Sequence, residues 1–370
     1  MNLFQDGEDG QAGRQPGNLD AQARSQGEKG ALKAVVVHGP RDVRVDTITV
    51  REPGPGEVRV AVEWGGICGS DVSYYAHGAS GTATLEHPLI LGHEVAGQVT
   101  AVGPGVSTDL LGTYAAVHPA TPVGELPDRL EGRDNLNTRV RYLGSAAFDP
   151  HTDGGFAEAI VVRADQLRTL PAGVSTRHGA LAEPLAVAMH AVSRAGDVRG
   201  RDVLVNGAGP IGCLVVAALK LAGAGTVTAA DVAPAPLGIA RALGAGTVLN
   251  LRAGDTLPSD APLVFEASGV PAALGAVLGA TARGGTLIQV GNLPGAPAPA
   301  ALGDLVTREI TWIGSYRFAD EITGAVRALG AGLDLEPLIS ASYDLPDAAA
   351  ALDRAAAGGG GKVMLRMGSR

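Results

Sequence analysis

Four side chains in the first half of the chain have the chemistry of a metal site. Cys68 lies in the glycine-rich stretch GICGSD, His93 and Glu94 follow Gly92, and Glu183 precedes a proline. Thiolate, imidazole and carboxylate are the ligand types that zinc prefers, and a catalytic zinc keeps about three protein ligands and one open position. Cys68 and His93, together with either Glu94 or Glu183, supply such a set. The pattern therefore predicts an open zinc site, at which the metal acts as a Lewis acid.

A second group of residues, further along the chain, predicts a dinucleotide site. Residues 207–212 read GAGPIG and directly follow the apolar run Val203–Asn206. In this spacing the first glycine permits a tight turn, the second lets the backbone approach a pyrophosphate, and the third lets helix and strand pack closely. The start of a helix adds N–H donors and the positive end of the helix dipole. The residues assigned to this contact are Gly207, Gly209, Pro210, Ile211 and Gly212.

Asp231 indicates which dinucleotide binds. It ends the next apolar run, where its carboxylate would accept hydrogen bonds from the adenosine ribose and repel a 2′-phosphate. The pattern predicts NAD rather than NADP. A glycine-rich turn without a ligand is the alternative for residues 207–212, but the flanking strand and helix favour the cofactor.

The elements that must position these residues change in character near residue 201. Before it, short apolar runs alternate with Gly, Pro and Asp, as in an irregular β domain, and after it strands alternate with helices, as in a doubly wound parallel sheet. The strands expected in the first region are residues 32–38, 43–50, 57–64, 94–102 and 156–162. In the second region the expected strands are 203–206, 227–230, 263–266 and 286–290, and the expected helices are 210–221 and 236–243.

Composition and charge exclude several classes of protein. A net charge of −9 over 370 residues offers no basic patch for nucleic acid or an anionic membrane surface. The longest apolar stretch, residues 211–222, is shorter than the ~20 residues of a membrane helix and is expected to be a buried helix. Cys68 and Cys213 are the only cysteines, which favours the reducing cytoplasm over a secreted disulfide scaffold. Residues 1–30 lack the apolar core of a secretory signal and are expected to be a disordered extension.

Taken together, these motifs resemble the zinc-containing medium-chain alcohol dehydrogenases, in particular the branch of sorbitol dehydrogenase and L-idonate 5-dehydrogenase. The resemblance covers residues 32–367, and it lies in GGICGSDVSYY at 65–75, HG at 77–78, PLILGHE at 88–94, EPL at 183–185, FEASG at 265–269 and GSYRF at 314–318. It implies an α/β protein with an N-terminal irregular, GroES-like β domain and a Rossmann cofactor domain. The implied division is a catalytic zinc domain at 31–184, an NAD-binding domain at 185–315 and a return to the catalytic domain at 316–370.

The resemblance also assigns roles at the metal. It implies that Cys68 and His93 bind zinc directly, with Glu94 and Glu183 as alternating acidic ligands or water-mediated neighbours. Asp71 would accept a hydrogen bond from the far ring nitrogen of His93, which fixes the tautomer and raises the basicity of the ligand.

Substrate and cofactor contacts follow from the same resemblance. Ser70 is expected to hydrogen-bond the alcohol and relay its proton. Arg317 is expected to reach the substrate cleft, where a guanidinium suits a hydroxyl pair or a sugar-acid carboxylate. Further cofactor contacts are expected at Ser268, Gly269 and Val290.

The chain departs from the family pattern in two places. Many relatives have a histidine five positions after the catalytic cysteine; here Ser73 stands there, so water, the cofactor ribose, or Tyr74 and Tyr75 would carry the proton outward. Relatives also hold a second, structural zinc with four closely spaced cysteines, whereas residues 122–137 contain none. One zinc per chain is therefore predicted. The aligned cysteine positions are Val123, Leu126, Arg129 and Asn137.

The combined reading predicts an enzyme that transfers a hydride from a secondary hydroxyl of a sugar acid such as idonate to NAD, as a homo-oligomeric dimer or tetramer. Sorbitol, xylitol or threonine are alternative substrates. An alternative of another class is a protein that binds a dinucleotide without catalysis. Ser73 and the missing cysteines favour this alternative, whereas the intact set of metal ligands argues against it. The remaining histidines considered, His77, His118 and His190, are expected to be structural or exposed.

Overall fold

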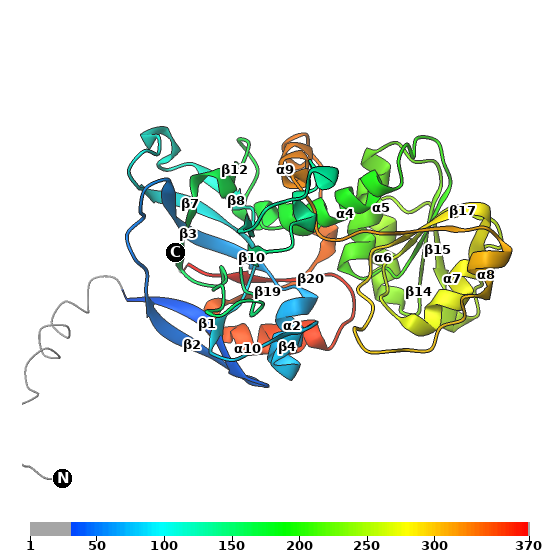
Figure 1. The fold of residues 1–370 in the computed structure, drawn as a ribbon, viewed down its shortest axis with the longest axis horizontal. Helices are drawn as coiled ribbons and strands as arrows, with labels where there is room; N and C mark the ends of the chain where they lie inside the picture. The colour runs from blue at the N-terminus through cyan, green and yellow to red at the C-terminus, as the bar shows by residue number, and fades with distance from the viewer. Residues whose placement is uncertain (1–30, 369–370) are drawn as a thin grey trace, which may run out of the picture.

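The computed structural model describes residues 31–368, and these form two lobes (Figure 1). One lobe combines the N-terminal strands with the last elements of the chain, and the other contains the parallel sheet. The extension expected at residues 1–30 lies outside the described residues. Within the described part of the chain, no helix is both long and apolar enough to cross a lipid bilayer.

A seven-stranded sheet forms the core of the first lobe. Its order is β12-β8-β7-β3-β20-β19, and β11 pairs with β3. Alternate residues of β3, namely Val58, Val60 and Val62, are buried, which is the period-two pattern of a sheet with one face on a core. The strands are β3 (Glu57–Gly66), β7 (Glu94–Val102), β8 (Tyr114–Val117), β11 (Ala159–Arg163), β12 (Leu167–Thr169), β19 (Ile339–Asp344) and β20 (Lys362–Arg366).

Smaller elements complete this lobe. A three-stranded sheet has the order β2-β1-β6, and β4–β5 and β9–β10 form separate ribbons. Helix α2 packs against α10 near the end of the chain. The elements are β1 (Ala31–Gly39), β2 (Asp42–Thr49), α2 (Gly69–His77), β4 (Ala79–Ser80), β5 (Ala83–Thr84), β6 (Leu89–Ile90), β9 (Ala120–Pro122), β10 (Val140–Tyr142), α3 (Thr176–Gly179) and α10 (Ala348–Ala356).

The second lobe is built on a six-stranded parallel sheet of order β15-β14-β13-β16-β17-β18. Its strands bury side chains on both faces: Leu263 and Phe265 of β16 belong to the core that contains α5 and α6, while Val264 belongs to the core that contains α7. The expected doubly wound sheet is confirmed, and the apolar stretch at 211–222 is a buried helix. The strands are β13 (Val203–Asn206), β14 (Val227–Asp231), β15 (Thr247–Asn250), β16 (Ala261–Glu266), β17 (Thr281–Gln289) and β18 (Thr311–Gly314). The helices are α5 (Pro210–Leu221), α6 (Pro234–Ala242), α7 (Leu274–Ala280) and α8 (Gly303–Thr307).

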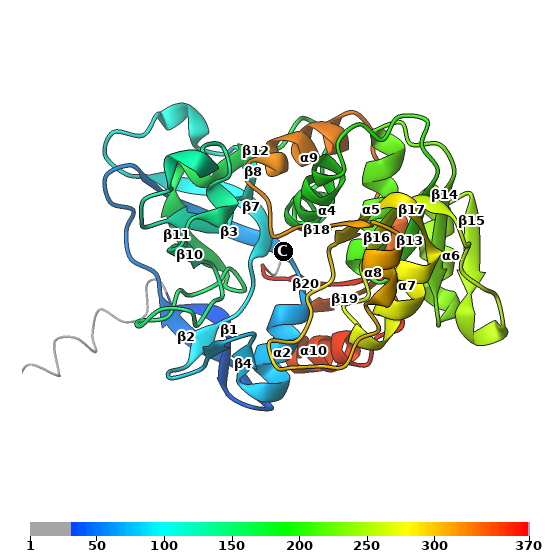
Figure 2. The same cartoon turned by 45° about the vertical axis from the view of Figure 1, so that its right-hand side comes forward.

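Two helices lie where the lobes meet, α4 (Ala182–Arg194) and α9 (Glu321–Gly330) (Figures 1 and 2). Helix α4 packs against both α5 and α9, and Leu185 shares a core with Val215 of α5. The last strands return to the first lobe, where Met364 of β20 lies opposite Gly66 of β3. Helix α4 also contacts β7, and β7, β3 and β20 are neighbours in one sheet, so side chains on these elements are held at fixed separations.

Candidate active site

Cys68, His93 and Glu94 come together in the first lobe. Cys68 is the residue before α2, and Glu94 begins β7 directly after His93. One ligand atom from each residue, a sulfur, an imidazole nitrogen and a carboxylate oxygen, lies within 4.8 Å of the other two. Of the residues that the structure describes, this is the one group of three or more such side chains at metal-binding spacing.

Asp71 ties the two ligand-bearing segments together. Its Oδ2 accepts a hydrogen bond from the backbone N–H of Cys68 at 2.9 Å, and its Oδ1 accepts one from Gly92 at 3.0 Å. The expectation that Asp71 accepts a hydrogen bond from His93 is wrong, because Oδ1 and Nδ1 are 3.9 Å apart. The backbone amides of Cys68 and Gly92 are the donors to this carboxylate, and the His93 ring lies beyond hydrogen-bond distance. Asp71 is fully buried and fixes the separation of the Cys68 and His93 backbones.

A lysine that no sequence motif indicated contacts Glu94. Lys362, the first residue of β20, donates from Nζ to Glu94 Oε1 at 2.7 Å and to the Ile67 carbonyl at 3.3 Å. Lys362 is 2% exposed and Glu94 0%. The sequence signal was weak: a lysine that opens the apolar run VML after four glycines.

Glu183 is held by a tyrosine that was also missed. The Tyr142 hydroxyl donates to Glu183 Oε1 at 2.6 Å, and the Tyr142 ring meets His93 edge-on with centroids 5.6 Å apart. Burial and the neighbouring Glu183 carboxylate raise the pKa of Tyr142 well above its usual value, so the phenol stays protonated and donates. Glu183 thus lies beside the Cys68, His93 and Glu94 group without belonging to it at the spacing given above.

The electrostatics of the site fit a divalent cation. Burial disfavours protonation of His93, yet Asp71, Cys68 and Glu183 outweigh this effect and raise the pKa of the imidazole to about 10. Burial raises the pKa of Glu94 to about 7, although Lys362 opposes the rise. Glu94 Oε2 is buried without a hydrogen-bond partner among the described residues. An excess of anionic donors and an unpartnered carboxylate oxygen are what a zinc ion would satisfy.

Ser70 lies in the first turn of α2, half-buried, two residues after Cys68. Ser73, Tyr74 and Tyr75 of the same helix each make a hydrogen bond within the protein. Ser73 donates to the Ala79 carbonyl, Tyr75 donates to Asp353, and the Tyr74 hydroxyl accepts from the N–H of Ala146. The hydroxyl protons of Ser73 and Tyr75 are thus bound within the protein, whereas the Tyr74 hydroxyl uses an acceptor lone pair.

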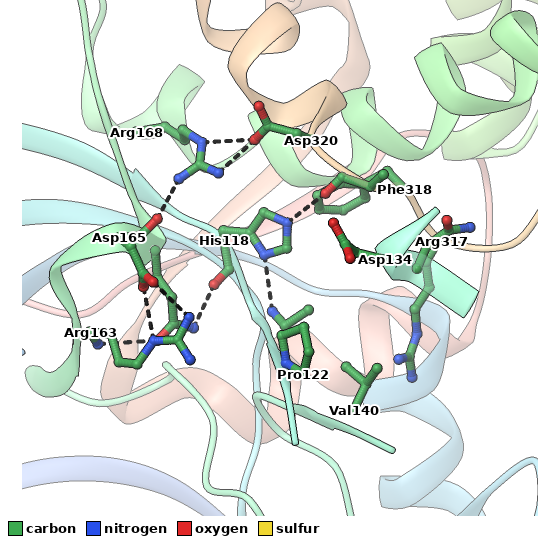
Figure 3. Close-up of a pocket in the computed structure, with 14 residues that line it drawn as sticks. His118, Pro122, Asp134, Val140, Arg163, Asp165, Arg168, Arg317, Phe318 and Asp320 are labelled. Atoms are coloured by element: carbon green, nitrogen blue, oxygen red, sulfur yellow. Dashed lines mark hydrogen bonds and ion pairs between the residues drawn. The ribbon is translucent and has the colours of Figure 1, made fainter. Parts of the chain in front are cut away.

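Arg317 stands over the tyrosine that holds Glu183. Its guanidinium carbon is 4.1 Å from the ring centroid of Tyr142 and 4.9 Å from that of Tyr316. Figure 3 shows the Arg317 side chain extending away from the ion pairs that Arg163 and Arg168 make in the same pocket. The loop thus directs one cation toward the Tyr142 side of the site.

The glycines of residues 207–212 have the geometry of a phosphate cradle. Gly207 has φ of 89°, and a Cβ there would lie 2.5 Å from the Ser268 amide nitrogen. A Cβ at Gly212 would collide with the Gly207 carbonyl, whereas one at Gly209 would meet nothing within 4 Å. Pro210 begins α5 and Ile211 follows it. The turn therefore packs tightly against the protein at Gly207 and Gly212 and leaves open space at Gly209, where a pyrophosphate could approach the backbone.

Asp231 ends β14 beside this turn. Its Oδ2 accepts from the N–H of Ala208 at 2.7 Å, and its Oδ1 accepts from the N–H of Ala233 at 2.9 Å. Each oxygen keeps a lone pair for a ribose hydroxyl. The carboxylate is therefore fixed next to the glycine turn, at the carboxyl edge of the sheet.

Ser268, Gly269 and Val290 follow the ends of β16 and β17 at the same edge. The Ser268 and Gly269 N–H groups donate to Glu266 Oε1, and Asn206 donates to Glu266 Oε2 at 2.7 Å. Glu266 is fully buried and was not singled out from the sequence. It fixes the crevice between β13 and β16, where the strand order reverses and where such folds bind dinucleotides.

Residues 122–137 form a cysteine-free loop that hydrogen bonds from Asn137 to nearby backbone groups stabilise. Asn137 donates from Nδ2 to the Gly124 carbonyl at 2.9 Å and accepts at Oδ1 from the Arg139 N–H at 2.9 Å. The neighbouring Asn135 is buried.

The histidines His77, His118 and His190 were expected to be structural or exposed. His77 is exposed, and His118 and His190 are hydrogen-bonded to protein groups.

Comparison with known protein families gives two matches. The alcohol dehydrogenase GroES-like domain matches residues 54–172, and the zinc-binding dehydrogenase domain matches residues 210–331. The first match contains Cys68, His93 and Glu94, and the second begins at Pro210 of the glycine turn.

Individual relatives cover nearly the whole chain. The chain is 37% identical over 326 residues to the L-idonate 5-dehydrogenase (NAD(P)(+)) of Escherichia coli, covering 86% of this chain and 94% of that protein. It is 34% identical over 333 residues to the sorbitol dehydrogenase of Bacillus subtilis, covering 88% and 93%. The crystal structure of L-idonate 5-dehydrogenase from Escherichia coli matches with a TM-score of 0.84 and 36% identity, covering 90% of this chain and 98% of that chain. A structure from Sinorhizobium meliloti bound to NADP matches with a TM-score of 0.83 and 30% identity, covering 91% and 100%.

Proposed function

Because the chain belongs to the zinc-binding medium-chain alcohol dehydrogenases, in the branch of sorbitol and L-idonate dehydrogenases, we propose that it oxidises a secondary hydroxyl of a sugar acid of the idonate type with NAD. The observation that carries the substrate class is Arg317: its guanidinium lies over Tyr142, whose hydroxyl holds Glu183 beside His93. A cation in that place suits a substrate carboxylate.

Cys68 and His93 would hold the zinc, with Glu94 or Glu183 as the acidic ligand. The spacing favours Glu94, whose Oε2 has no hydrogen-bond partner within residues 31–368 while its Oε1 is paired with Lys362. Glu183 Oε1 already accepts a hydrogen bond from the Tyr142 hydroxyl. Bound zinc supplies Lewis acidity at the alcohol oxygen, and bound NAD supplies the hydride acceptor.

The side chains around this centre orient the substrate and move its proton. Ser70 would accept the hydroxyl proton of the substrate and pass it to water or the cofactor ribose, since the hydroxyl protons of Ser73 and Tyr75 are already donated within the protein. Arg317 would bind the carboxylate and so place one secondary hydroxyl at the metal side of the site. The neutral Tyr142 phenol keeps Glu183 in place and gives the guanidinium an aromatic face.

Substitution of Arg317 by methionine tests the substrate class. For idonate we expect kcat/KM to fall about tenfold to a hundredfold, because a charge-assisted contact is lost. Sorbitol, which has no carboxylate, should lose less. The measurement is the initial rate of NADH formation for both substrates with the wild type and the variant.

Arg163→Met is the matched control for this experiment. Arg163 lines the same pocket, but its guanidinium is held by Asp165 at 2.9 and 2.8 Å. Arg163→Met should leave kcat/KM nearly unchanged for both substrates. If Arg317→Met lowers kcat/KM equally for idonate and sorbitol, Arg317 contacts hydroxyls that both substrates share, or it contacts Glu183. No activity of the wild type on idonate would overturn the sugar-acid proposal and leave the polyol alternative.

Asp231→Ala tests the choice of cofactor. A carboxylate beside the ribose repels a 2′-phosphate, so the wild type should prefer NAD, and the variant should narrow the ratio of kcat/KM for NAD over NADP by roughly tenfold or more. Asp202→Ala is the control, because Asp202 also accepts a backbone N–H, from Thr226 at 2.8 Å, but precedes β13 at the opposite edge of the sheet. Equal efficiency of the wild type with both cofactors would count against Asp231 as the selector.

Three parts of the proposal concern the whole assembly. We expect one zinc per chain, a homo-oligomer of two or four subunits, and a cytoplasmic location. Elemental analysis, light scattering coupled to size exclusion, and cell fractionation measure them. A protein that binds NADH but holds no metal and turns over none of a panel of polyols and aldonic acids would support the non-catalytic alternative.

A further inference from the structure

The loop that carries Arg317 has a backbone conformation that needs support. Arg317 has φ of 52°, in the left-handed region that a side chain other than glycine rarely adopts. Such a conformation costs free energy and persists only where neighbouring groups fix it. Residues 316–319 are therefore expected to relax unless they are held from outside.

Hydrogen bonds hold this loop at both ends. At its start, Asn135 donates from Nδ2 to the Tyr316 carbonyl at 2.8 Å. At its end, the Ala319 N–H donates to Glu321 Oε2 at 2.7 Å, and His118 Nε2 lies 3.0 Å from the Ala319 carbonyl, to which it donates. Figure 3 shows the His118 bond beside Phe318.

A buried imidazole connects the two ends. His190 Nδ1 lies 2.7 Å from Glu321 Oε1, and its Nε2 lies 3.4 Å from Asn135 Nδ2. One neutral tautomer satisfies both contacts: Nδ1–H donates to the carboxylate, and Nε2 accepts from the amide. Both N–H groups of Asn135 are then used. Asn135 is 7% exposed and His190 6%, so losing either bond would leave a buried polar group unpaired.

The connection reaches the metal side of the site through α4. His190 follows Glu183 by seven residues on this helix, which places both side chains on one face. The helix that brings Glu183 to Tyr142 thus brings His190 to the support of the Arg317 loop. Asn135 comes from the turn Asp134–Leu136, inside the cysteine-free segment 122–137.

We propose that Asn135 is a positioning residue for substrate recognition: segment 122–137 holds the Tyr316 carbonyl through Asn135, and the Asn135–His190–Glu321 chain keeps Arg317 over Tyr142. The kinetic part of this inference rests on the proposed role of Arg317. The structural part, that Asn135 fixes residues 316–319, does not.

Hydrogen exchange measures the structural part directly. Asn135→Ala should speed the exchange of the amides of residues 316–319 by about threefold to tenfold, the effect of one lost hydrogen bond. Asn137→Ala is the matched control, with the same residue type in the same segment, because its side chain bonds Gly124 and Arg139 and, in the part of the chain that the structure describes, nothing of the Arg317 loop. It should leave residues 316–319 unchanged. If Asn135→Ala leaves them unchanged as well, the proposal is wrong.

A double-mutant cycle measures the kinetic part. Asn135→Ala should raise KM for idonate about threefold to tenfold with a smaller change in kcat, and in the Arg317→Met background it should have no further effect on KM. Equal effects in both backgrounds would show that Asn135 does not act through Arg317. If Arg317→Met itself leaves KM unchanged, the proposed function of Arg317 fails, and the exchange experiment still decides the role of Asn135.

Asn135→Asp covers the case in which the alanine variant folds poorly. It keeps the volume of the side chain and loses the donors, so it should give the same faster exchange at residues 316–319. Exchange at the wild-type rate in a folded Asn135→Asp protein would overturn the proposal. His190→Gln, which keeps a donor and an acceptor, should fall between the wild type and Asn135→Ala in both measurements.

Discussion

Replacing Cys68 with alanine is expected to remove the zinc and to lower kcat/KM at least about a thousandfold. The group within 4.8 Å then loses its thiolate, and His93 and Glu94 alone hold a divalent ion poorly. Without Lewis acidity at the substrate oxygen, the remaining side chains supply orientation only. The measurement is elemental analysis after dialysis, together with the rate of NADH formation.

Cys213→Ala is the control for this result. Cys213 is the other cysteine of the chain, buried in α5, where its thiol donates to the Ala208 carbonyl at 3.1 Å. The control variant should keep the zinc content of the wild type. Retention of zinc by Cys68→Ala would contradict the proposed site. Two zinc ions per wild-type chain would contradict the expectation for residues 122–137.

Lys362→Met is expected to lower the free energy of unfolding by about 3–5 kcal/mol. Burial already raises the pKa of Glu94 to about 7, so at a pH clearly above that value the substitution leaves a fully buried carboxylate without its 2.7 Å partner, and an unpaired buried charge is costly. Lys362→Arg keeps the cation and should lose less. The measurement is urea unfolding of the three proteins with a chelator present, because Glu94 is a proposed zinc ligand and zinc that binds only the folded state adds to the apparent stability.

A second substitution separates loss of charge pairing from loss of packing. In Lys362→Met combined with Glu94→Gln, neither partner is charged, so much of the lost stability should return. A double variant as unstable as Lys362→Met would assign the loss to the packing of the Lys362 side chain rather than to the ion pair. Unchanged stability of Lys362→Met would mean that Glu94 is neutral in the folded protein.

Much of the fold and of the cofactor site could be predicted from the sequence, because these features depend on residues that are close together along the chain. The spacing of residues 207–212 reports backbone geometry directly: Gly207 needs its left-handed φ, and Gly212 has no room for a Cβ. The alternation of strands and helices after residue 201 predicted the parallel sheet, because the local period of apolar residues reflects which faces of each element are buried. Cys68, His93 and Glu94 were identifiable by chemical type beside glycines.

Tertiary structure alone decided how the site residues are paired. Lys362 and Glu94 are 268 residues apart, Asn135 and Tyr316 are 181 apart, and Tyr142 and Glu183 are 41 apart. No local pattern records such contacts, because they arise only when separate strands and helices pack. Lysine and asparagine are also usually exposed, so composition argues against their burial until a partner is seen. The family resemblance implied a hydrogen bond between Asp71 and His93. In the folded chain Asp71 instead accepts from the backbone amides of Cys68 and Gly92, and His93 Nδ1 lies 3.9 Å away.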